Sequence, residues 1–271
     1  MKTLYISDLD GTLFNKSKKI SIFAADVINK CIEEGMLFSV ATARMPYGCD
    51  YRLKDIHMTI PGILTNGVFL YDFKNEKYVS VENIGAEVAK QVVKIFKDVK
   101  LSCFVYIFTQ DYDTKSMEEQ TQYYSDRALE KCGEVKMVSD LKQILNTGDI
   151  CYLAYTGHKE ELQPVCEKLD KLKGICYSFY LNIYNGMYCL EIFSDKANKK
   201  NALIKLKKLL ECEEVVVFGD NFNDLPMIEL ADRSYAPENA LPEIKEKVTE
   251  VLEDCDHDGV AKFLKNEFSE N

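Results

Sequence analysis

The stretch Leu4-Tyr5-Ile6-Ser7-Asp8-Leu9-Asp10-Gly11-Thr12 decides the fold, because a short apolar run passes directly into two carboxylates and a glycine. Three further apolar runs end as abruptly, each before polar residues: 36–41 before Thr42-Ala43-Arg44, 62–64 before Thr65-Asn66-Gly67, and 215–218 before Gly219-Asp220-Asn221. Short continuous apolar runs are typical of strands buried on both faces, as in a parallel sheet covered by helices. The sequence therefore predicts a parallel sheet whose strands are followed by polar residues.

Apolar residues recur at helical spacing between these runs. Residues 23–32 carry one such stripe, with Ser21 in the position of an N-cap and Gly35 at the C-terminal end. Residues 202–210 form a second stripe among lysines. This alternation predicts an α/β fold with a doubly wound, mostly parallel, Rossmann-like sheet, in which ligands bind beyond the carboxyl ends of the strands. Four polar residues follow those ends: Asp8, Thr42, Asn66 and Asp220.

The middle of the chain has no polar strand ends of this kind and is rich in tyrosine. Its patterns predict helices near 88–96, 116–131 and 159–173, and strands near 103–108, 150–155, 175–182 and 187–193. We interpret this segment as an inserted α+β domain. The predicted organisation is a discontinuous Rossmann-like core, residues 1–84 and 193–271, interrupted by an α+β cap domain, residues 85–192.

Charge and cysteine usage limit the class of protein. The 271 residues include 34 Lys and Arg against 44 Asp and Glu, a formal net charge of −10. A nucleic-acid-binding protein normally presents a basic face, so we expect no nucleic-acid partner. The ten cysteines include no C-x-x-C pair, which is typical of reduced thiols in a cytoplasmic protein. No apolar run approaches the roughly 20 residues of a membrane span, so we expect no membrane association.

Two acidic clusters follow predicted strands. Asp8 and Asp10 are two residues apart, so both carboxylates face the same side of an extended chain, and Gly11 lets the chain turn there. Asp220 and Asp224 form the second cluster. Carboxylates this close repel one another unless a cation lies between them, and oxygen ligands of this kind favour Mg²⁺. Taken singly, the clusters also fit an Asp-Gly turn and a helix N-cap; taken together, they predict a metal site.

Four motifs occur in order along the chain: Asp8-Leu9-Asp10-Gly11-Thr12-Leu13, Thr42 with Arg44, Lys199, and Gly219-Asp220-Asn221-Phe222-Asn223-Asp224. They resemble the motifs of the haloacid dehalogenase-like hydrolases. More narrowly, they resemble the Cof-type phosphatases, which insert a large α/β cap between the second and third motifs. The segments 65–67 and 258–261 are also similar to parts of that group. The resemblance spans the whole chain and implies a Rossmann-like catalytic core with a cap that selects the substrate.

The resemblance also implies a role for each motif residue. Asp8 would be the nucleophile that forms an aspartyl-phosphate, and Asp10 would protonate the leaving alcohol and then activate water. Thr42 would hydrogen-bond a phosphoryl oxygen, and Lys199 would neutralise charge on the phosphate and on Asp8. Mg²⁺ would be held by four aspartates, Asp10 acting through its backbone carbonyl and Asp224 in support: Asp8, Asp10, Asp220 and Asp224.

Other polar residues of the motifs are expected near the substrate. Asn223 resembles the family position that contacts the phosphoryl group. Arg44 is expected to reach the substrate or the cap, and a surface position fits it nearly as well. Asn66 would line the mouth of the pocket or form a tight turn. Two further lysines open the same predicted helix as Lys199 and are alternatives to it: Lys196 and Lys200. The three histidines fall outside every motif and are expected at the surface.

The predicted function is Mg²⁺-dependent hydrolysis of small phosphorylated metabolites, sugar phosphates foremost, by a monomer or weak homo-oligomer. Two alternatives use the same aspartate. One is a phosphosugar mutase, and the other is a non-enzymatic phosphoacceptor module, for which a single small domain would suffice. Cap tyrosines are candidates for stacking on a substrate ring, although core packing is the commoner role: Tyr106, Tyr112, Tyr123, Tyr124, Tyr155, Tyr177 and Tyr184.

Overall fold

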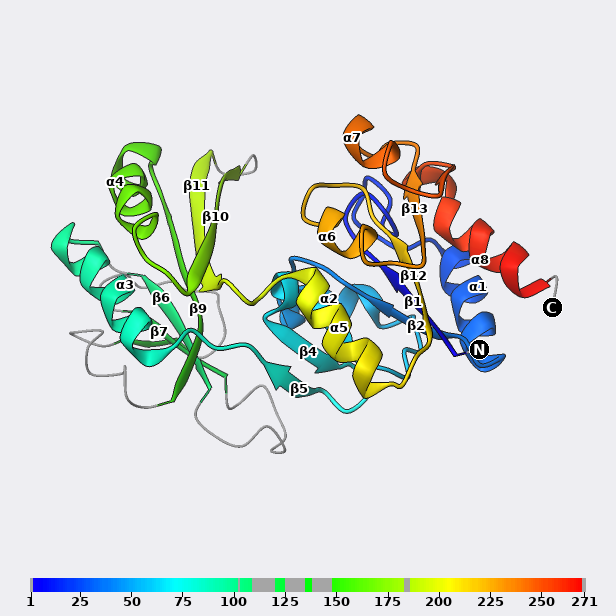
Figure 1. Ribbon diagram of the computed structural model, residues 1–271, viewed down its shortest axis with the longest axis horizontal. Helices are drawn as coiled ribbons and strands as arrows, with labels where there is room; N and C mark the ends of the chain where they lie inside the picture. Colours follow the sequence, from blue (N-terminus) through cyan, green and yellow to red (C-terminus); the bar gives the residue numbers. More distant parts are fainter. Residues whose placement is uncertain are drawn as a thin grey trace. The chain divides into compact units, whose positions relative to one another are not determined.

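The computed structural model (Figure 1) describes residues 2–101, 103–108, 120–124, 135–137, 148–182 and 186–269. The chain forms two compact units. The first unit comprises residues 1–80 and 198–271, so both ends of the sequence contribute to it, and the second comprises residues 81–197. The second unit is therefore an insertion between two halves of the first.

Five parallel strands form the central sheet of the first unit, in the order β14-β13-β12-β1-β2. Their bounds are β1 (Thr3–Ser7), β2 (Leu37–Val40), β12 (Glu214–Phe218), β13 (Arg233–Pro237) and β14 (Glu250–Leu252). Ser7 lies beside Val40 on one side and Phe218 on the other, so β1, β2 and β12 end at the same edge. The chain passes from β1 to β2 on one side and later to β12 on the other. β1 therefore marks a topological switch point, the place where ligands of such sheets bind.

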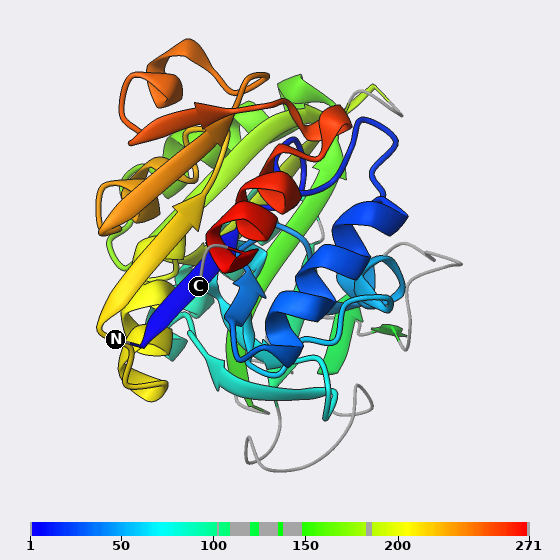
Figure 2. The same cartoon turned by 90° about the vertical axis from the view of Figure 1, so that its right-hand side faces the viewer.

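Helices cover both faces of this sheet, as the doubly wound prediction requires. Figure 2 shows α1 (Ile22–Glu33) and α8 (Gly259–Ser269) in front of the strands, and on that face the Phe263 ring lies 5.5 Å from the Phe218 ring. The opposite face packs Leu4 and Ile6 against Leu203. Three helices contribute to that second layer: α5 (Lys199–Leu209), α6 (Leu225–Ile228) and α7 (Pro242–Lys245). The prediction of an α/β fold with a parallel sheet is confirmed.

Capping residues explain where two of the helices begin. The Ser21 hydroxyl accepts the Ala24 amide at 2.9 Å and caps α1, as predicted. The Asn198 side chain accepts the Asn201 amide at 2.8 Å, so α5 begins at Lys199. Lys196 lies in the turn before the cap, and the prediction that it opens the same helix is wrong.

Residues 62–64 do not continue the parallel sheet, contrary to prediction. A single parallel bridge links Ala41 to Ile63. The strand β3 (Gly62–Leu64) pairs antiparallel with β4 (Phe69–Asp72), and β5 (Lys77–Val81) completes a separate three-stranded sheet. The reason is the tight turn at 65–67, which folds the chain back after only three residues, so that β4 takes most of the hydrogen bonds of β3.

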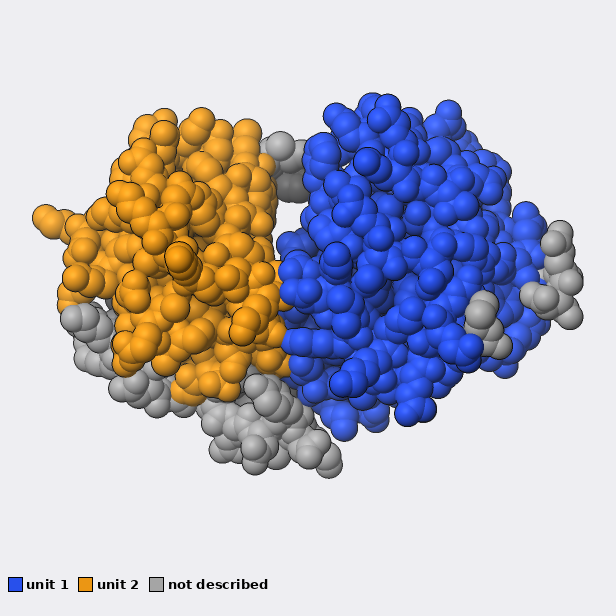
Figure 3. All heavy atoms as spheres, viewed as in Figure 1, with its two compact units in different colours: residues 1–80, 198–271 blue, residues 81–197 orange. Residues whose placement is uncertain are grey.

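The second unit is drawn in orange in Figure 3. It has a six-stranded sheet in the order β10-β11-β9-β6-β7-β8. Its elements are α3 (Ala86–Asp98), β6 (Phe104–Phe108), β7 (Gln120–Tyr124), β8 (Val135–Met137), β9 (Asp149–Gly157), α4 (Lys159–Leu169), β10 (Ile175–Asn182) and β11 (Met187–Ser194). The helices and the sheet share a core that includes Phe96, Leu162 and Leu190. The unit is thus α+β, as predicted.

One element of the second unit was predicted wrongly. Residues 116–131 were expected to form a helix, but 120–124 form β7, which pairs antiparallel with β6. The stretch Gln-Thr-Gln-Tyr-Tyr contains residue types that favour strands, and pairing with β6 adds hydrogen bonds that no local pattern reveals. The rest of the predicted helix lies outside the described residues.

The cysteines of the described part of the chain are free thiols, most of them buried. Burial raises the pKa of Cys103 and of Cys151, so both remain protonated and unreactive. This agrees with the expectation of reduced thiols. Among the described residues, no helix combines the length and apolar character needed to cross a membrane.

Candidate active site

A buried lysine joins the two halves of the first unit at the carboxyl edge of the sheet. Lys199 Nζ lies 2.6 Å from Asp8 Oδ1 and 2.6 Å from Asp224 Oδ1. Lys199 is 1% exposed, Asp8 6% and Asp224 0%. Asp8 directly follows β1, and its amide donates to the Phe218 carbonyl at 2.9 Å, so the carboxylate stands where β1 and β12 end. Of the three candidate lysines, the structure brings Lys199 to Asp8.

Asp224 shapes the loop that carries Asp220. Its Oδ2 accepts the amides of Asp220 at 3.0 Å and Asn221 at 3.1 Å, which fixes the turn after β12. Asp220 Oδ1 in turn accepts the Thr12 hydroxyl at 2.9 Å. Thr12 belongs to the first motif, but sequence reasoning gave it no role, because its partner stands 208 residues away.

Burial and mutual repulsion perturb the acids of this cluster. Burial raises the pKa of Asp8; the Asp224 charge acts in the same direction and the Lys199 ammonium opposes it. Burial, followed by the Asp224 charge, raises the pKa of Asp220 to about 6. Burial disfavours the Lys199 ammonium, but the neighbouring Asp224 and Asp8 carboxylates outweigh it and raise the pKa of Lys199. The negative charge of the three carboxylates therefore exceeds what the single Lys199 ammonium can compensate.

This excess of carboxylate fits a divalent cation. Asp8, Asp220 and Asp224 each offer an oxygen within 4.8 Å of the others. Hard oxygen ligands of this kind suit Mg²⁺. The Asp224 oxygens already accept from Lys199 and two amides, so Asp224 fits the supporting role expected of it. The Asp10 side chain is not part of this cluster.

Asp10 instead forms an ion pair with Arg44. Arg44 Nε lies 2.6 Å from Asp10 Oδ2, and a terminal guanidinium nitrogen lies 2.6 Å from Asp10 Oδ1. Sequence reasoning missed this pair: it expected Arg44 to meet the substrate or the cap, or to lie at the surface. The two residues are 34 positions apart, on the loops that follow β1 and β2.

The loop after β3 lies at the edge of the site and is hydrogen-bonded to the neighbouring loops. Thr42 is 1% exposed, and its carbonyl accepts the Asn66 amide at 3.0 Å. Asn223 Nδ2 lies 3.3 Å from Asn66 Oδ1, so the loops after β2, β3 and β12 are linked by hydrogen bonds. The predicted site residues are therefore neighbours in space: Asp8, Asp10, Thr42, Arg44, Asn66, Lys199, Asp220, Asn223 and Asp224.

Backbone strain at residues 65–67 accompanies this arrangement. Thr65 and Asn66 have φ of 51° and 52°, a region that a β-branched residue such as Thr65 rarely adopts. Gly67 has φ of 102°, and a Cβ there would lie 2.4 Å from the Asn198 carbonyl oxygen. Asn198 caps α5 directly before Lys199, so Gly67 permits the close approach that seats the lysine.

We expect Gly67→Ala to cost about 2–4 kcal/mol of unfolding free energy and to lower activity, because the new methyl group must displace Asn198. Gly35→Ala is the matched control: Gly35 has nearly the same φ, 103°, but nothing lies within 4 Å of its Cβ position. It should cost only about 1 kcal/mol. Urea unfolding and an activity assay check both, and equal losses of stability would show that the contact with Asn198 does not matter.

Another residue with no sequence signal supports the first motif. Asn239 Nδ2 donates to the Gly11 carbonyl at 2.7 Å, while its Oδ1 accepts the Cys255 amide at 2.9 Å. Nothing in the pattern around Asn239 indicates this contact across 228 positions. The histidines are exposed, as expected: His57, His158 and His257.

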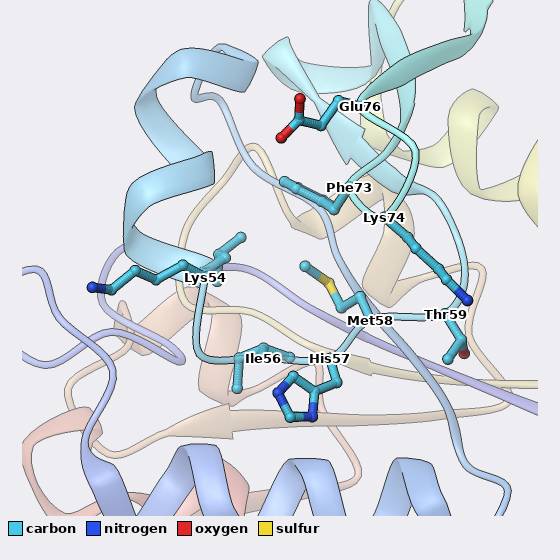
Figure 4. Close-up of a pocket in the computed structure, with 9 residues that line it drawn as sticks. Lys54, Ile56, His57, Met58, Thr59, Phe73, Lys74 and Glu76 are labelled. Atoms are coloured by element: carbon cyan, nitrogen blue, oxygen red, sulfur yellow. The ribbon is translucent and has the colours of Figure 1, made fainter.

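A cavity of about 440 Å³ lies elsewhere in the first unit (Figure 4). Met58 and Phe73 face it, while the ammonium groups of Lys54 and Lys74 point away in opposite directions. None of the acidic cluster lines it. The predicted site residues therefore lie outside this cavity.

The structure describes the side chains of three of the candidate ring-stacking tyrosines. Tyr155 is 4% exposed and packs in the core of the second unit, and Tyr106 is 7% exposed and packs edge-on against Tyr152. Tyr177 is half-buried and donates to Asp170 at 2.6 Å. Core packing thus explains Tyr106 and Tyr155. Tyr112 and Tyr184 lie outside the described residues, and of Tyr123 and Tyr124 only the backbone is described.

The fold and the site together define a class of protein. A buried lysine between aspartates, at the switch point of a parallel sheet, is an arrangement for stabilising an anionic group beside a cation. The chain belongs to the haloacid dehalogenase-like hydrolases: a family model of that description matches residues 5–264. The chain is therefore a hydrolytic enzyme of the phosphatase type, since its relatives are named phosphatases. The resemblance drawn from the motifs is confirmed.

Several known proteins are similar over nearly the whole chain. A 5-amino-6-(5-phospho-D-ribitylamino)uracil phosphatase of Bacillus subtilis is 26% identical over 290 residues, 97% of each chain. An HMP-PP phosphatase of Yersinia enterocolitica is 25% identical, covering 98% of this chain and 95% of the relative. A solved Thermotoga maritima structure has a TM-score of 0.78 at 24% identity, covering 98% and 97% of the two chains. It supports the fold alone.

Proposed function

We propose that the protein is a Mg²⁺-dependent phosphatase that hydrolyses small phosphorylated metabolites, including sugar phosphates, through an aspartyl-phosphate on Asp8. The observation that carries this is the buried contact of Asp8 with Lys199 at the switch point. The names of the relatives add support, because they include phosphatases of a ribitylaminouracil phosphate and of HMP-PP, both small phosphorylated metabolites.

In the first step, an Asp8 carboxylate oxygen attacks phosphorus as the bond from phosphorus to the leaving oxygen breaks. Asp10, which acquires a proton from solvent as the substrate binds, gives this proton to that leaving oxygen. Lys199, Thr42 and Asn223 stabilise the phosphoryl oxygens, and Arg44 and Asn66 lie at the edge of the same site. When bound, Mg²⁺ neutralises charge beside the phosphate, held by Asp8, Asp220 and the Asp10 carbonyl with Asp224 in support.

In the second step, Asp10 takes a proton from water as the water oxygen attacks phosphorus and the bond to Asp8 breaks. Phosphate leaves and Asp8 is again a carboxylate. Asp10 releases its proton to solvent and is again the carboxylate that pairs with Arg44. We assign the choice of leaving group to the inserted domain, residues 85–192, which leaves the phosphoryl chemistry to the core, residues 1–84 and 193–271.

The charge of the site makes the metal necessary for an anionic substrate. Four aspartates stand against Lys199 and Arg44, which leaves two negative charges uncompensated before phosphate arrives. A divalent cation cancels that excess. Chelation should therefore remove both phosphate binding and turnover.

A phosphate-release screen over phosphorylated metabolites tests the proposal. We expect release with Mg²⁺, none in chelator, and recovery when Mg²⁺ is restored. Release of free phosphate distinguishes hydrolysis from a mutase, which would return the phosphoryl group to the substrate. Full activity in chelator would contradict the proposed function.

The titration of Asp220 predicts how Mg²⁺ affects stability. Its pKa of about 6 in the folded protein lies above its ordinary value, so the folded state binds the extra proton as pH falls below about 6. Without metal, the unfolding free energy should fall by about 1–3 kcal/mol as pH rises from about 4 to about 6. Mg²⁺, which binds the ionised acids, should therefore stabilise the protein more at about pH 7.5 than at about pH 5.

Thermal and urea unfolding with and without Mg²⁺ check this. Asp220→Asn is the matched control, because the amide cannot titrate, and the difference between wild type and this variant isolates Asp220 from other acids. If that difference does not depend on pH, or if Mg²⁺ stabilises equally at both pH values, the electrostatic account of the cluster is wrong.

A further inference from the structure

None of the catalytic steps described above uses the ion pair between Arg44 and Asp10. We propose that Arg44 is the positioning residue for Asp10: its guanidinium orients the carboxylate in the substrate-free enzyme and gives up one carboxylate oxygen when the substrate's phosphoryl group arrives. This inference rests on the proposed function, since it concerns the group that would donate the proton.

The geometry of the pair fixes the orientation of Asp10. Two donors from one planar guanidinium meet two oxygens of one carboxylate, each at 2.6 Å. Such bidentate pairs fix orientation as well as distance, unlike contacts with a lysine. The Asp10 side chain is 41% exposed, so the rest of the protein surrounds it only in part. Arg44 is therefore the main constraint on how its carboxylate points.

Arg44 itself is held more firmly than its partner. Its side chain is 18% exposed, and its guanidinium lies 5.8 Å from the centre of the Phe14 ring, within range of a cation–π contact. Its amide donates to Thr42 Oγ1 at 3.2 Å, and its carbonyl accepts the Thr65 amide at 3.0 Å. The backbone of Arg44 is thus tied to the same loops that place Thr42 and Asn66.

Substrate binding has to break one of the two hydrogen bonds between Arg44 and Asp10. Asp10 can transfer a proton to a leaving oxygen only through a carboxylate oxygen that contacts it, and Arg44 occupies both. A phosphate monoester brings new anionic oxygens that a guanidinium binds as readily as a carboxylate. Arg44 can therefore exchange one bond to Asp10 for one to the phosphoryl group, which also agrees with its expected position near the substrate.

Two substrates with the same phosphoryl group separate this role from others. The p-nitrophenolate of p-nitrophenyl phosphate leaves without a proton, whereas the alcohol of glycerol 3-phosphate needs one. Because both substrates form the same phosphoenzyme, kcat/KM is compared, which reports only the steps up to departure of the leaving group. We expect Arg44→Gln to lower kcat/KM about 100-fold on glycerol phosphate but less than about 10-fold on p-nitrophenyl phosphate. Asp10→Asn should show the same selectivity in kcat/KM, while its kcat falls on both substrates because the second step is slowed. Arg44→Lys should recover part of the loss of kcat/KM on glycerol phosphate.

Arg52→Gln is the matched control, because Arg52 lies on α2 (Pro46–Leu53) near the same loop and donates to the Gly48 carbonyl at 3.0 Å. It should change kcat/KM on both substrates by the same small factor. A second readout follows the exchange directly: the ¹⁵N signal of Arg44 Nε, identified by its loss in Arg44→Lys, should shift when orthovanadate is added with Mg²⁺.

Equal losses on both substrates in Arg44→Gln would overturn the proposal, since a phosphate clamp or a purely structural residue affects both alike. An unchanged Arg44 signal in saturating orthovanadate would overturn the exchange. Failure of the proposed function is a separate result: wild type then releases phosphate from neither substrate, before any Arg44 variant is made, and the inference falls with it.

Discussion

Replacing Asp8 by Asn is expected to reduce phosphate release by at least about 10⁴-fold. The amide has almost the shape of the carboxylate and can still accept from Lys199, but it is not a nucleophile. Among the described residues, the other carboxylates of the site are engaged elsewhere. Asp224 is fully buried with its oxygens accepting from Lys199 and two amides, Asp220 accepts the Thr12 hydroxyl, and Asp10 is paired with Arg44. Steady-state phosphate release across the active substrates measures the loss.

The stability of this variant provides its control. Because burial raises the pKa of Asp8, its ionised form is costly in the metal-free protein. Asp8→Asn removes that charge and should leave the unfolding free energy in chelator equal to or above that of wild type. A folded, inactive variant attributes the loss to chemistry. Comparable turnover by Asp8→Asn would defeat the mechanism.

Lys199→Met should lower both activity and stability. Methionine has a similar length but no charge, so Asp8 and Asp224 lose the cation that both contact at 2.6 Å. Breaking a buried ion pair from one side costs about 3–5 kcal/mol. Activity should fall by about 10²–10³-fold or more, because the phosphoryl oxygens lose a fixed positive charge. Urea unfolding and phosphate release measure the two effects.

Neighbouring lysines are matched controls for that variant. Lys196 is exposed in the turn before α5, and Lys200 is the next residue along the helix. Each changed to methionine removes the same charge from the same stretch of chain, and each should stay within about 0.5 kcal/mol of wild type with near-normal activity. If Lys200→Met abolished activity while Lys199→Met did not, the assignment of the lysine would be wrong.

The sequence predicted those parts of the fold that local patterns determine. Three apolar runs form β1, β2 and β12: residues 4–6, 36–41 and 215–218. A strand buried on both faces needs a continuous apolar sequence, so these runs indicate it directly. The strand β7 and the separate sheet of β3, β4 and β5 were not predicted correctly. Their positions depend on which strand edge is available for pairing, and a short stretch of sequence does not contain that information.

The predictions for the site divide in the same way, between residues that local motifs indicate and contacts that only the folded chain creates. The acidic clusters after the apolar runs predicted Asp8 and Asp220 as site residues, and the resemblance to the family motifs predicted Lys199. The contacts between Arg44 and Asp10, between Thr12 and Asp220, and between Asn239 and Gly11 join loops distant in sequence, and only the folded chain reveals them. The raised pKa of Asp220 likewise depends on burial, which sequence spacing does not determine.

Trapping the phosphoenzyme tests the central claim most directly. Asp10→Asn is mixed with p-nitrophenyl phosphate and Mg²⁺, quenched in acid, and its peptides are weighed. The leaving group needs no proton, so the first step proceeds, while the lack of a base for water slows the second and lets the intermediate accumulate. We predict the mass of one phosphoryl group on the peptide that holds Asp8, absent from the double variant with Asp8→Asn. Release of nitrophenolate with no phosphoryl group on that peptide, or with the group on another residue, would contradict the account.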